Sequence, residues 1–295
     1  MVCEQCHKEN RGIAKFCKWC GTPLVSQNVL DKLVGLSDLK AQLKTIVDTY
    51  TYLRSRKDVS TIRLSVNAII IGETGTGKTA LAEIIKDFFY QHRIIAKSKL
   101  TMVDAVDYSR FVDNWDENIN KARDGILFFD NVQKLLPDKY SNQVNPLDKL
   151  FVEMDKWEDN PIVMMAGLPK GLNDFLESNP AIKNRFKYTF HLPTPNYREL
   201  ADITKMTLRM KYGIIDFSKE ANEQLLRFFK YQIKIKDETF GNAHLAMKTA
   251  EDIFTSFISR GSDAAKVELT DEEFDSLEEA LNQCRIYGHR GLGGF

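Results

Sequence analysis

One eight-residue stretch constrains the fold of this chain more than any other. Residues 72–79 read Gly-Glu-Thr-Gly-Thr-Gly-Lys-Thr, a full match to the phosphate-binding pattern G-x-x-x-x-G-K-[ST]. The pattern is meaningful between a buried strand and a helix, because its glycines turn successive backbone N–H groups toward a phosphate at the helix N-terminus. The apolar run 68–71 precedes the loop and a helical pattern at 80–89 follows it. The sequence therefore predicts a nucleotide-binding α/β fold.

The motif also predicts roles for individual side chains. Lys78 can reach the β- and γ-phosphates, and the Thr79 hydroxyl can bind Mg²⁺. A second apolar strand, at residues 125–129, ends on Asp130, which is expected to complete the Mg²⁺ shell. The residues expected to contact ATP are Gly72, Thr74, Gly75, Thr76, Gly77, Lys78, Thr79 and Ala80.

Alternating strand and helix patterns extend this prediction along the chain. Residues 162–166 and 188–192 are predicted to form further strands, and helical stretches separate them. Such alternation over about 60–195 indicates a doubly wound parallel sheet. Four helical periodicities follow within residues 196–284, broken at glycines, so an all-helical C-terminal part is expected.

The cysteines predict a small module of a different kind. Four of the five cysteines form two Cys-x-x-Cys pairs, at Cys3, Cys6, Cys17 and Cys20. Two such pairs make a tetrahedral thiolate shell that suits Zn²⁺, and a redox dithiol would require a βαβ context that is absent here. Because the short N-terminal segment that carries these cysteines cannot build a sufficient apolar core, the metal would supply its folding energy. Trp19 is either an exposed contact residue of this ribbon or packs against it.

Composition excludes several classes of function. Hydrophobic residues make up 43% and charged residues 28%, as in ordinary globular proteins. Lys plus Arg and Asp plus Glu number 41 each, and no basic stripe is present, so a nucleic-acid partner is not favoured. No apolar run approaches the ~20 residues of a membrane helix, and no secretory signal is visible. We therefore expect a soluble, cytoplasmic protein.

These motifs, taken in order, resemble AAA+ ATPases, and specifically the group that contains the red-type rubisco activase and the stage V sporulation protein K. The resemblance runs from about residue 33 to 259, and the N-terminal stretch CEQCHKENRGIAKFCKWCGTPL resembles bacterial zinc-ribbon modules. It implies an α/β P-loop sheet followed by an all-helical lid subdomain. The expected division is residues 1–25 zinc ribbon, 26–193 ATP-binding subdomain, 194–285 helical lid and 286–295 tail.

The resemblance also implies roles for residues outside the motifs. In the segment LVGLSDLKAQLK, the residues Val34, Gly35 and Leu36 would flank the adenine. The segment FLESNPAIKNRF is similar to the one that carries the family's arginine finger, which maps onto Arg185. The segment GNAHLAMKTAEDIF is similar to the sensor 2 helix and places His244 near the γ-phosphate. An ATP site between subunits and a ring, most often a hexamer, would follow, with a chaperone-like action on a protein partner.

The chain departs from the family where hydrolysis is catalysed. The residue after Asp130 is normally a glutamate that activates water, and here it is Asn131, which cannot accept a proton. Loss of a general base costs about 10²–10⁴ in rate. The sensor 2 arginine is replaced by His244, which is largely neutral at pH 7. Glu73, inside the P-loop, or Asp113 would then supply a carboxylate near the γ-phosphate.

Two further regions differ from the family. The sensor 1 region reads Ala166-Gly167-Leu168, without an Asn or Thr to orient water. The pore-loop segment matches best at Phe111 and Val112. Phe111 would either grip a translocating polypeptide or pack on its own domain.

Three functions remain open from the sequence. The first is an ATP-driven ring that remodels a protein partner recruited by the zinc ribbon. The second is a slowly hydrolysing or non-hydrolysing scaffold or switch, which Asn131 and His244 favour because the residues they replace act on hydrolysis more than on binding. A mixed ring with a catalytic companion subunit would reconcile the two. A DNA-associated ATPase is the least favoured.

Overall fold

The computed structural model describes the residues that contain the predicted nucleotide site. The described residues are 8, 19, 29–56, 65–135, 147–157, 160–178, 183–212, 217, 219–236 and 240–259. The four clustered cysteines lie outside these ranges, and so does the last of the four predicted helical stretches, at residues 270–284. The zinc ribbon therefore stays a prediction.

A five-stranded parallel sheet forms the centre of the structure. The strands are β1 (Ala68–Gly72), β2 (Leu100–Asp104), β3 (Ile126–Asp130), β4 (Ile162–Gly167) and β5 (Tyr188–Leu192). They lie in the order β2-β3-β4-β1-β5, and every neighbouring pair is parallel. The three strands β1, β3 and β4 are buried almost throughout, which explains why their sequences are continuous apolar runs. The predicted parallel sheet is confirmed.

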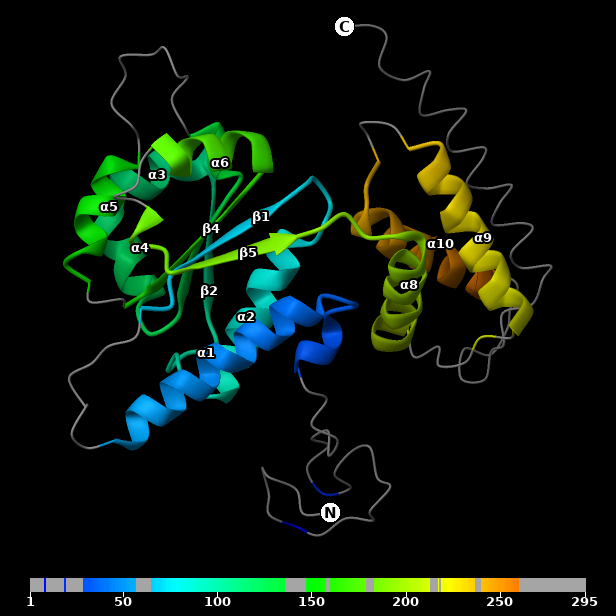
Figure 1. Cartoon of the computed structure of the whole chain (residues 1–295), viewed down its shortest axis with the longest axis horizontal. Coiled ribbons are helices and arrows are strands. Elements are labelled where there is room, and N and C mark those ends of the chain that lie inside the picture. The colour runs from blue at the N-terminus through cyan, green and yellow to red at the C-terminus, as the bar shows by residue number, and fades with distance from the viewer. Residues whose placement is uncertain are drawn as a thin grey trace, which may run out of the picture.

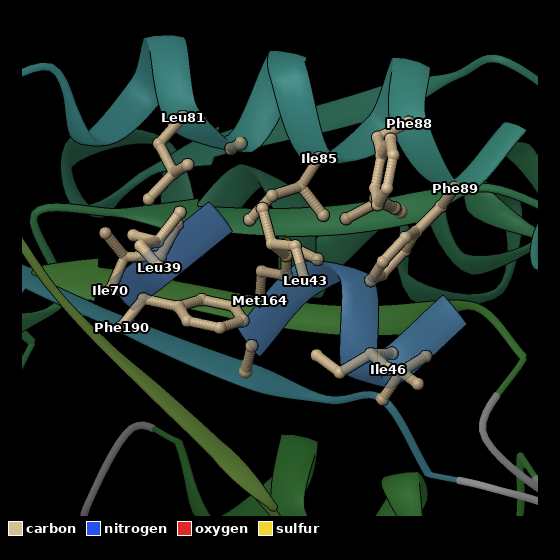
Figure 2. Close-up of a cluster of buried hydrophobic side chains, with 14 of the residues drawn as sticks. Leu39, Leu43, Ile46, Ile70, Leu81, Ile85, Phe88, Phe89, Met164 and Phe190 are labelled. Atoms are coloured by element: carbon tan, nitrogen blue, oxygen red, sulfur yellow. The ribbon is translucent and has the colours of Figure 1, made fainter. Parts of the chain in front are cut away.

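One face of the sheet is covered by the helix that follows the predicted loop and by two helices that precede β1 in the chain. These are η1 (Val29–Lys32), α1 (Ser37–Ser55) and α2 (Lys78–Gln91). Figure 2 shows α2 above and α1 crossing it, with Leu43 and Ile85 directed into the same apolar layer. Ile70 and Phe190 from the sheet complete this layer. Packing of this kind fixes α2, and with it the position of the loop, against the sheet.

The opposite face carries the short helices. They are η3 (Ala105–Asp107), α3 (Tyr108–Asp113), α4 (Trp115–Ala122), η4 (Val132–Lys134), α5 (Asp148–Met154) and α6 (Pro169–Ser178). Because side chains alternate along a strand, Ile70 lies in the first layer while Ile69 and Ile71 belong to this second one. Figure 1 shows α3–α6 on one side of the sheet and α1 and α2 on the other.

Three helices follow the sheet and form their own apolar cluster. They are α8 (Tyr197–Tyr212), α9 (Lys219–Lys234) and α10 (Ala243–Ser259). Buried residues such as Leu208, Phe229 and Ala250 hold them together. Figure 1 shows β5 running directly into α8 and the three helices grouped beside the end of the sheet. We call α8, α9 and α10 the C-terminal helices; their action as a lid stays a prediction.

No helix among the described residues combines the length and the apolar character that crossing a membrane requires.

Candidate nucleotide-binding site

The predicted phosphate loop joins β1 to α2 in a tight turn. Thr76 closes it, since its Oγ1 donates a hydrogen bond to the carbonyl oxygen of Glu73 at 2.8 Å. Gly75 and Gly77 have φ angles of 72° and 94°, a left-handed conformation that favours glycine. Gly77 is the N-cap of α2, so the free N–H groups of the first helical turn face the loop, where an anion is stabilised.

Lys78 is held inside the loop by the backbone. Its ammonium donates to the carbonyl oxygens of Gly72 and Glu73, both at 2.9 Å. Burial lowers the pKa of Lys78, while the charges of Asp130 and Glu73 act in the opposite direction. The ammonium is therefore poised at the loop, where it can exchange a carbonyl oxygen for a phosphate oxygen.

Thr79 and Asp130 meet across the gap between α2 and β3. The Thr79 hydroxyl donates to Oδ2 of Asp130 at 2.8 Å, and Oδ1 of Asp130 accepts from the backbone N–H of Asn131 at 2.8 Å. A hydroxyl and a carboxylate oxygen are a donor set that Mg²⁺ accepts, because Mg²⁺ keeps several waters and takes few protein ligands. No cluster of three or more His, Cys, Asp or Glu that could hold a metal ion occurs in the described part of the chain.

Asn131 contacts a carboxylate that the sequence analysis did not identify. Its Nδ2 donates to Oδ2 of Asp104 at 2.7 Å, and Oδ1 of Asp104 accepts from the N–H of Val106 at 2.9 Å. These two hydrogen bonds, with the charge of Lys134, lower the pKa of Asp104, the bond from Val106 most. Asp104 ends β2 beside Asp130 at the end of β3. Strand order, which the sequence does not state, would have been needed to find it.

The N-terminus of α10 lies against the phosphate loop. Asn242 donates from Nδ2 to the carbonyl oxygen of Thr74 at 2.8 Å, and a Cβ on Gly75 would overlap the carbonyl oxygen of Gly241. His244 lies in the first turn of the helix, with an exposed side chain. The structure therefore brings the predicted sensor 2 segment to the loop. Asn242 was not predicted, and it is the residue that makes the contact.

The segment expected to flank adenine lies next to the first C-terminal helix. Gly35 has a φ of 64°, and a Cβ there would lie 2.5 Å from Oε1 of Glu199 in α8. Leu36 is also left-handed and precedes α1. Val34 is partly exposed beside them. The roles of these residues toward adenine stay predictions.

The structure also places Arg185 and Phe111, which were expected to act as the arginine finger and in the pore loop. Arg185 is half-buried and pairs with Asp155. Phe111 is 5% exposed and packs against Phe129 and Trp115, so of its two interpretations the packed one is correct.

Two further observations concern the sensor 1 region and the ribbon. The side chain of Gln133, missed in the sequence, accepts a hydrogen bond from the N–H of Leu168 at 3.2 Å, at the end of β4. Trp19 is 57% exposed, with the ammonium of Lys8 4.7 Å from its ring centre; its role as a contact residue stays a prediction.

Comparison with known proteins agrees with this geometry. Residues 68–194 match the model of the "ATPase family associated with various cellular activities (AAA)". These residues form an AAA ATPase domain. Such a domain implies ATP as the nucleotide, together with Mg²⁺, and the loop, Thr79 and Asp130 fit both. The match spans all five strands, from β1 to β5.

Two groups of curated relatives share this domain. The ESX-1 secretion system protein EccA1 of Mycobacterium tuberculosis is 24% identical over 223 residues, which are 68% of this chain and 39% of EccA1. The chain thus spans about two fifths of the length of that relative. Protein CfxQ homolog of Guillardia theta is 25% identical over 276 residues, covering 88% of this chain and 92% of the relative. The CfxQ homologues agree with the rubisco activase-like resemblance.

Solved structures support the fold. A mutant of RuvB from Thermotoga maritima superposes with a TM-score of 0.55 at 15% identity, covering 86% of this chain and 72% of the other. At that identity the likeness concerns the fold alone.

Proposed function

We propose that this protein binds ATP and Mg²⁺, assembles into a ring and remodels or switches a protein partner, with attenuated hydrolysis. The observation that carries the proposal is the closed phosphate loop, in which Lys78 and the Thr79–Asp130 pair occupy one AAA ATPase domain. In it the loop N–H groups and Lys78 bind the phosphates. Thr79 and Asp130 hold Mg²⁺, which supplies charge neutralisation at the phosphates when bound.

The attenuation follows from two residues. Asn131 follows Asp130 but offers an amide, which orients water and does not take its proton. His244 offers an imidazole where the AAA+ group that the sequence resembles has an arginine, so it would stabilise γ-phosphate charge less than an arginine does. Both changes weaken turnover more than they weaken ATP binding. A nucleotide-dependent switch needs tight binding and tolerates slow turnover.

The ring and the partner are supported by the relatives and by Arg185. Arg185 would reach the ATP of a neighbouring subunit, so that assembly depends on ATP. The relative EccA1 is named as a protein of a secretion system. We propose a protein partner here too, in the cytoplasm, with the zinc ribbon as its contact. The ring would be a homo-oligomer, most simply a hexamer, or a mixed ring.

Mass measurement in defined nucleotide states tests this proposal. Light scattering of the full chain should show a monomer-sized species without nucleotide and a ring-sized species with Mg-ATP. Lys78→Ala should stay small in both conditions, because it removes the loop cation. Phosphate release, measured on the same samples, gives the turnover. A wild type that binds no ATP, or that keeps one mass in all nucleotide states, would contradict the proposal.

Asn131 specifically favours a second candidate, a nucleotide-gated scaffold or adaptor that does not hydrolyse ATP at a useful rate. The same samples separate the two. A ring that holds ATP unchanged over many hours, with and without a candidate partner, would indicate the scaffold. A ring whose ATP turns over, however slowly, would indicate the remodelling or switching ATPase.

A further inference from the structure

We propose that Asp104 is the proton acceptor for ATP hydrolysis in this chain, with Asn131 orienting the water. This rests on the proposed function, because it assigns the base within that site. Asn131 lacks a carboxylate, yet it contacts one, since its Nδ2 lies 2.7 Å from Oδ2 of Asp104. The catalytic pair is therefore divided between the ends of β2 and β3.

The fold fixes this pair from both sides. Asp104 is the last residue of β2 and lies in register with Asp130 at the end of β3, so its carboxylate emerges at the same sheet edge as the loop. One of its oxygens is held by the N–H of Val106 at 2.9 Å. Asn131 is held through its own N–H by Asp130 at 2.8 Å and has a left-handed φ of 56°. The contact between Asn131 and Asp104 is thus held by two hydrogen bonds from backbone N–H groups.

Other carboxylates near this edge are committed elsewhere or exposed. The side chains of Glu73 and Asp113 are exposed, and neither provides the hydrogen bond that Asn131 makes with Asp104. Asp107, three residues after Asp104, pairs with Arg110 at 3.3 Å on the surface. Among the described residues, Asp104 is therefore the carboxylate that the structure joins to the residue following Asp130.

The reaction step balances with these groups alone. A water, hydrogen-bonded to Oδ1 of Asn131, attacks the γ-phosphorus of ATP with an oxygen lone pair. The bond from the γ-phosphorus to the β,γ-bridging oxygen breaks, and its electron pair stays on ADP. The proton released by the water passes to the Asp104 carboxylate and then to solvent. The products are ADP and inorganic phosphate, and no oxidant or further reactant is consumed.

The substitution Asp104→Asn separates a base from a positioning residue. The amide oxygen of the new side chain can still accept a hydrogen bond from Val106 or Asn131, so the anchoring is largely kept while the proton-accepting charge is lost. Asp107→Asn is the matched control, because it removes an exposed carboxylate from the same stretch. We measure ATP affinity and the steady-state rate of phosphate release on the full chain. We expect Asp104→Asn to lower the rate about 100-fold or more with ATP affinity kept, and Asp107→Asn to change neither beyond about twofold.

A swapped variant guards against a merely structural loss. Asp104→Asn combined with Asn131→Asp restores one carboxylate and one amide to the pair, and we expect it to regain at least about tenfold over Asp104→Asn alone. A rate kept within about twofold in Asp104→Asn would overturn the inference. So would a swapped variant that binds ATP normally but regains no rate.

The wild type separates this inference from the proposed function. Wild-type protein that binds ATP and assembles but never hydrolyses would also overturn the inference, while ATP binding and assembly would stand. Wild-type protein that binds no ATP would instead contradict the proposed function.

Discussion

Arg185 and Asp155 form a two-bonded ion pair. Nε of Arg185 donates to Oδ1 of Asp155 at 2.9 Å, and Nη2 donates to Oδ2 at 2.6 Å. The hydrogen bonds lower the pKa of Asp155 and raise that of Arg185, so both groups are charged at neutral pH. Asp155 follows α5, whereas Arg185 lies just before β5. An arginine that serves a neighbouring subunit's phosphate must first leave this carboxylate.

Removing the carboxylate should therefore promote assembly. We expect Asp155→Asn to lower the ATP concentration at which rings form, because Arg185 no longer has this charged partner within its own chain. Arg185→Ala should reduce assembly or turnover without weakening ATP affinity in the monomer. Sedimentation at several ATP concentrations measures both. Glu153→Gln is the control, since it breaks the neighbouring ion pair with Lys156. An Asp155→Asn variant that assembles like wild type would argue against the arginine-finger role.

The contact between Asn242 and Thr74 predicts a link between the C-terminal helices and ATP binding. Asn242 is 3% exposed and has a left-handed φ of 48°, so Asn242→Gly removes the side chain and keeps the backbone conformation. One neutral hydrogen bond contributes about 0.5–1.5 kcal/mol, which corresponds to about 2- to 10-fold in affinity. We expect ATP affinity to fall by that factor. Lys248→Ala, at an exposed position in α10, the helix that Asn242 precedes, should leave ATP affinity unchanged. Unchanged ATP affinity in Asn242→Gly would contradict the link.

Asn131 predicts an interdependence between two substitutions. From the sequence alone, restoring glutamate at 131 should raise turnover at least about tenfold. In the structure, however, a glutamate there would face the carboxylate of Asp104 and would need a left-handed backbone, which costs about 1–2 kcal/mol. We therefore expect Asn131→Glu alone to gain little. The double variant Asn131→Glu with Asp104→Asn should hydrolyse ATP faster than Asn131→Glu alone. Equal rates for the two variants would show that the carboxylates do not interact.

The N-terminal cysteines predict one zinc ion. Metal analysis of protein never exposed to a chelator should find about one Zn per chain. Cys17→Ser should lose that zinc and leave ATP affinity unchanged, because the phosphate loop is held between β1 and α2, whose buried side chains pack against one another. If protein purified without a chelator contains no zinc, the prediction is wrong.

The fold was predictable to the extent that local pattern determines it. The strands at 68–71 and 162–166 could be assigned because buried parallel strands are continuous apolar runs. The P-loop could be assigned because its glycines allow the backbone to turn tightly around a phosphate. The partner of Asn131 was not predictable, since Asp104 is 27 residues away and meets it only through strand order. Asn242 was not predictable either, because it is 168 residues from Thr74 and meets it only where the start of α10 lies against the phosphate loop. Phe111 could be read as exposed or packed until its neighbours were known.

The most direct measurement is the affinity for Mg-ATP, by equilibrium titration of the full chain and of Lys78→Ala. Lys78 lies within the loop, 2.9 Å from two backbone carbonyl oxygens, whereas Lys97 pairs with Asp124 on the surface. Lys97→Ala is therefore the charge-matched control. We expect wild type and Lys97→Ala to bind with equal affinity and Lys78→Ala to lose binding. Equal affinity in all three proteins would contradict the assignment of this loop as the ATP site.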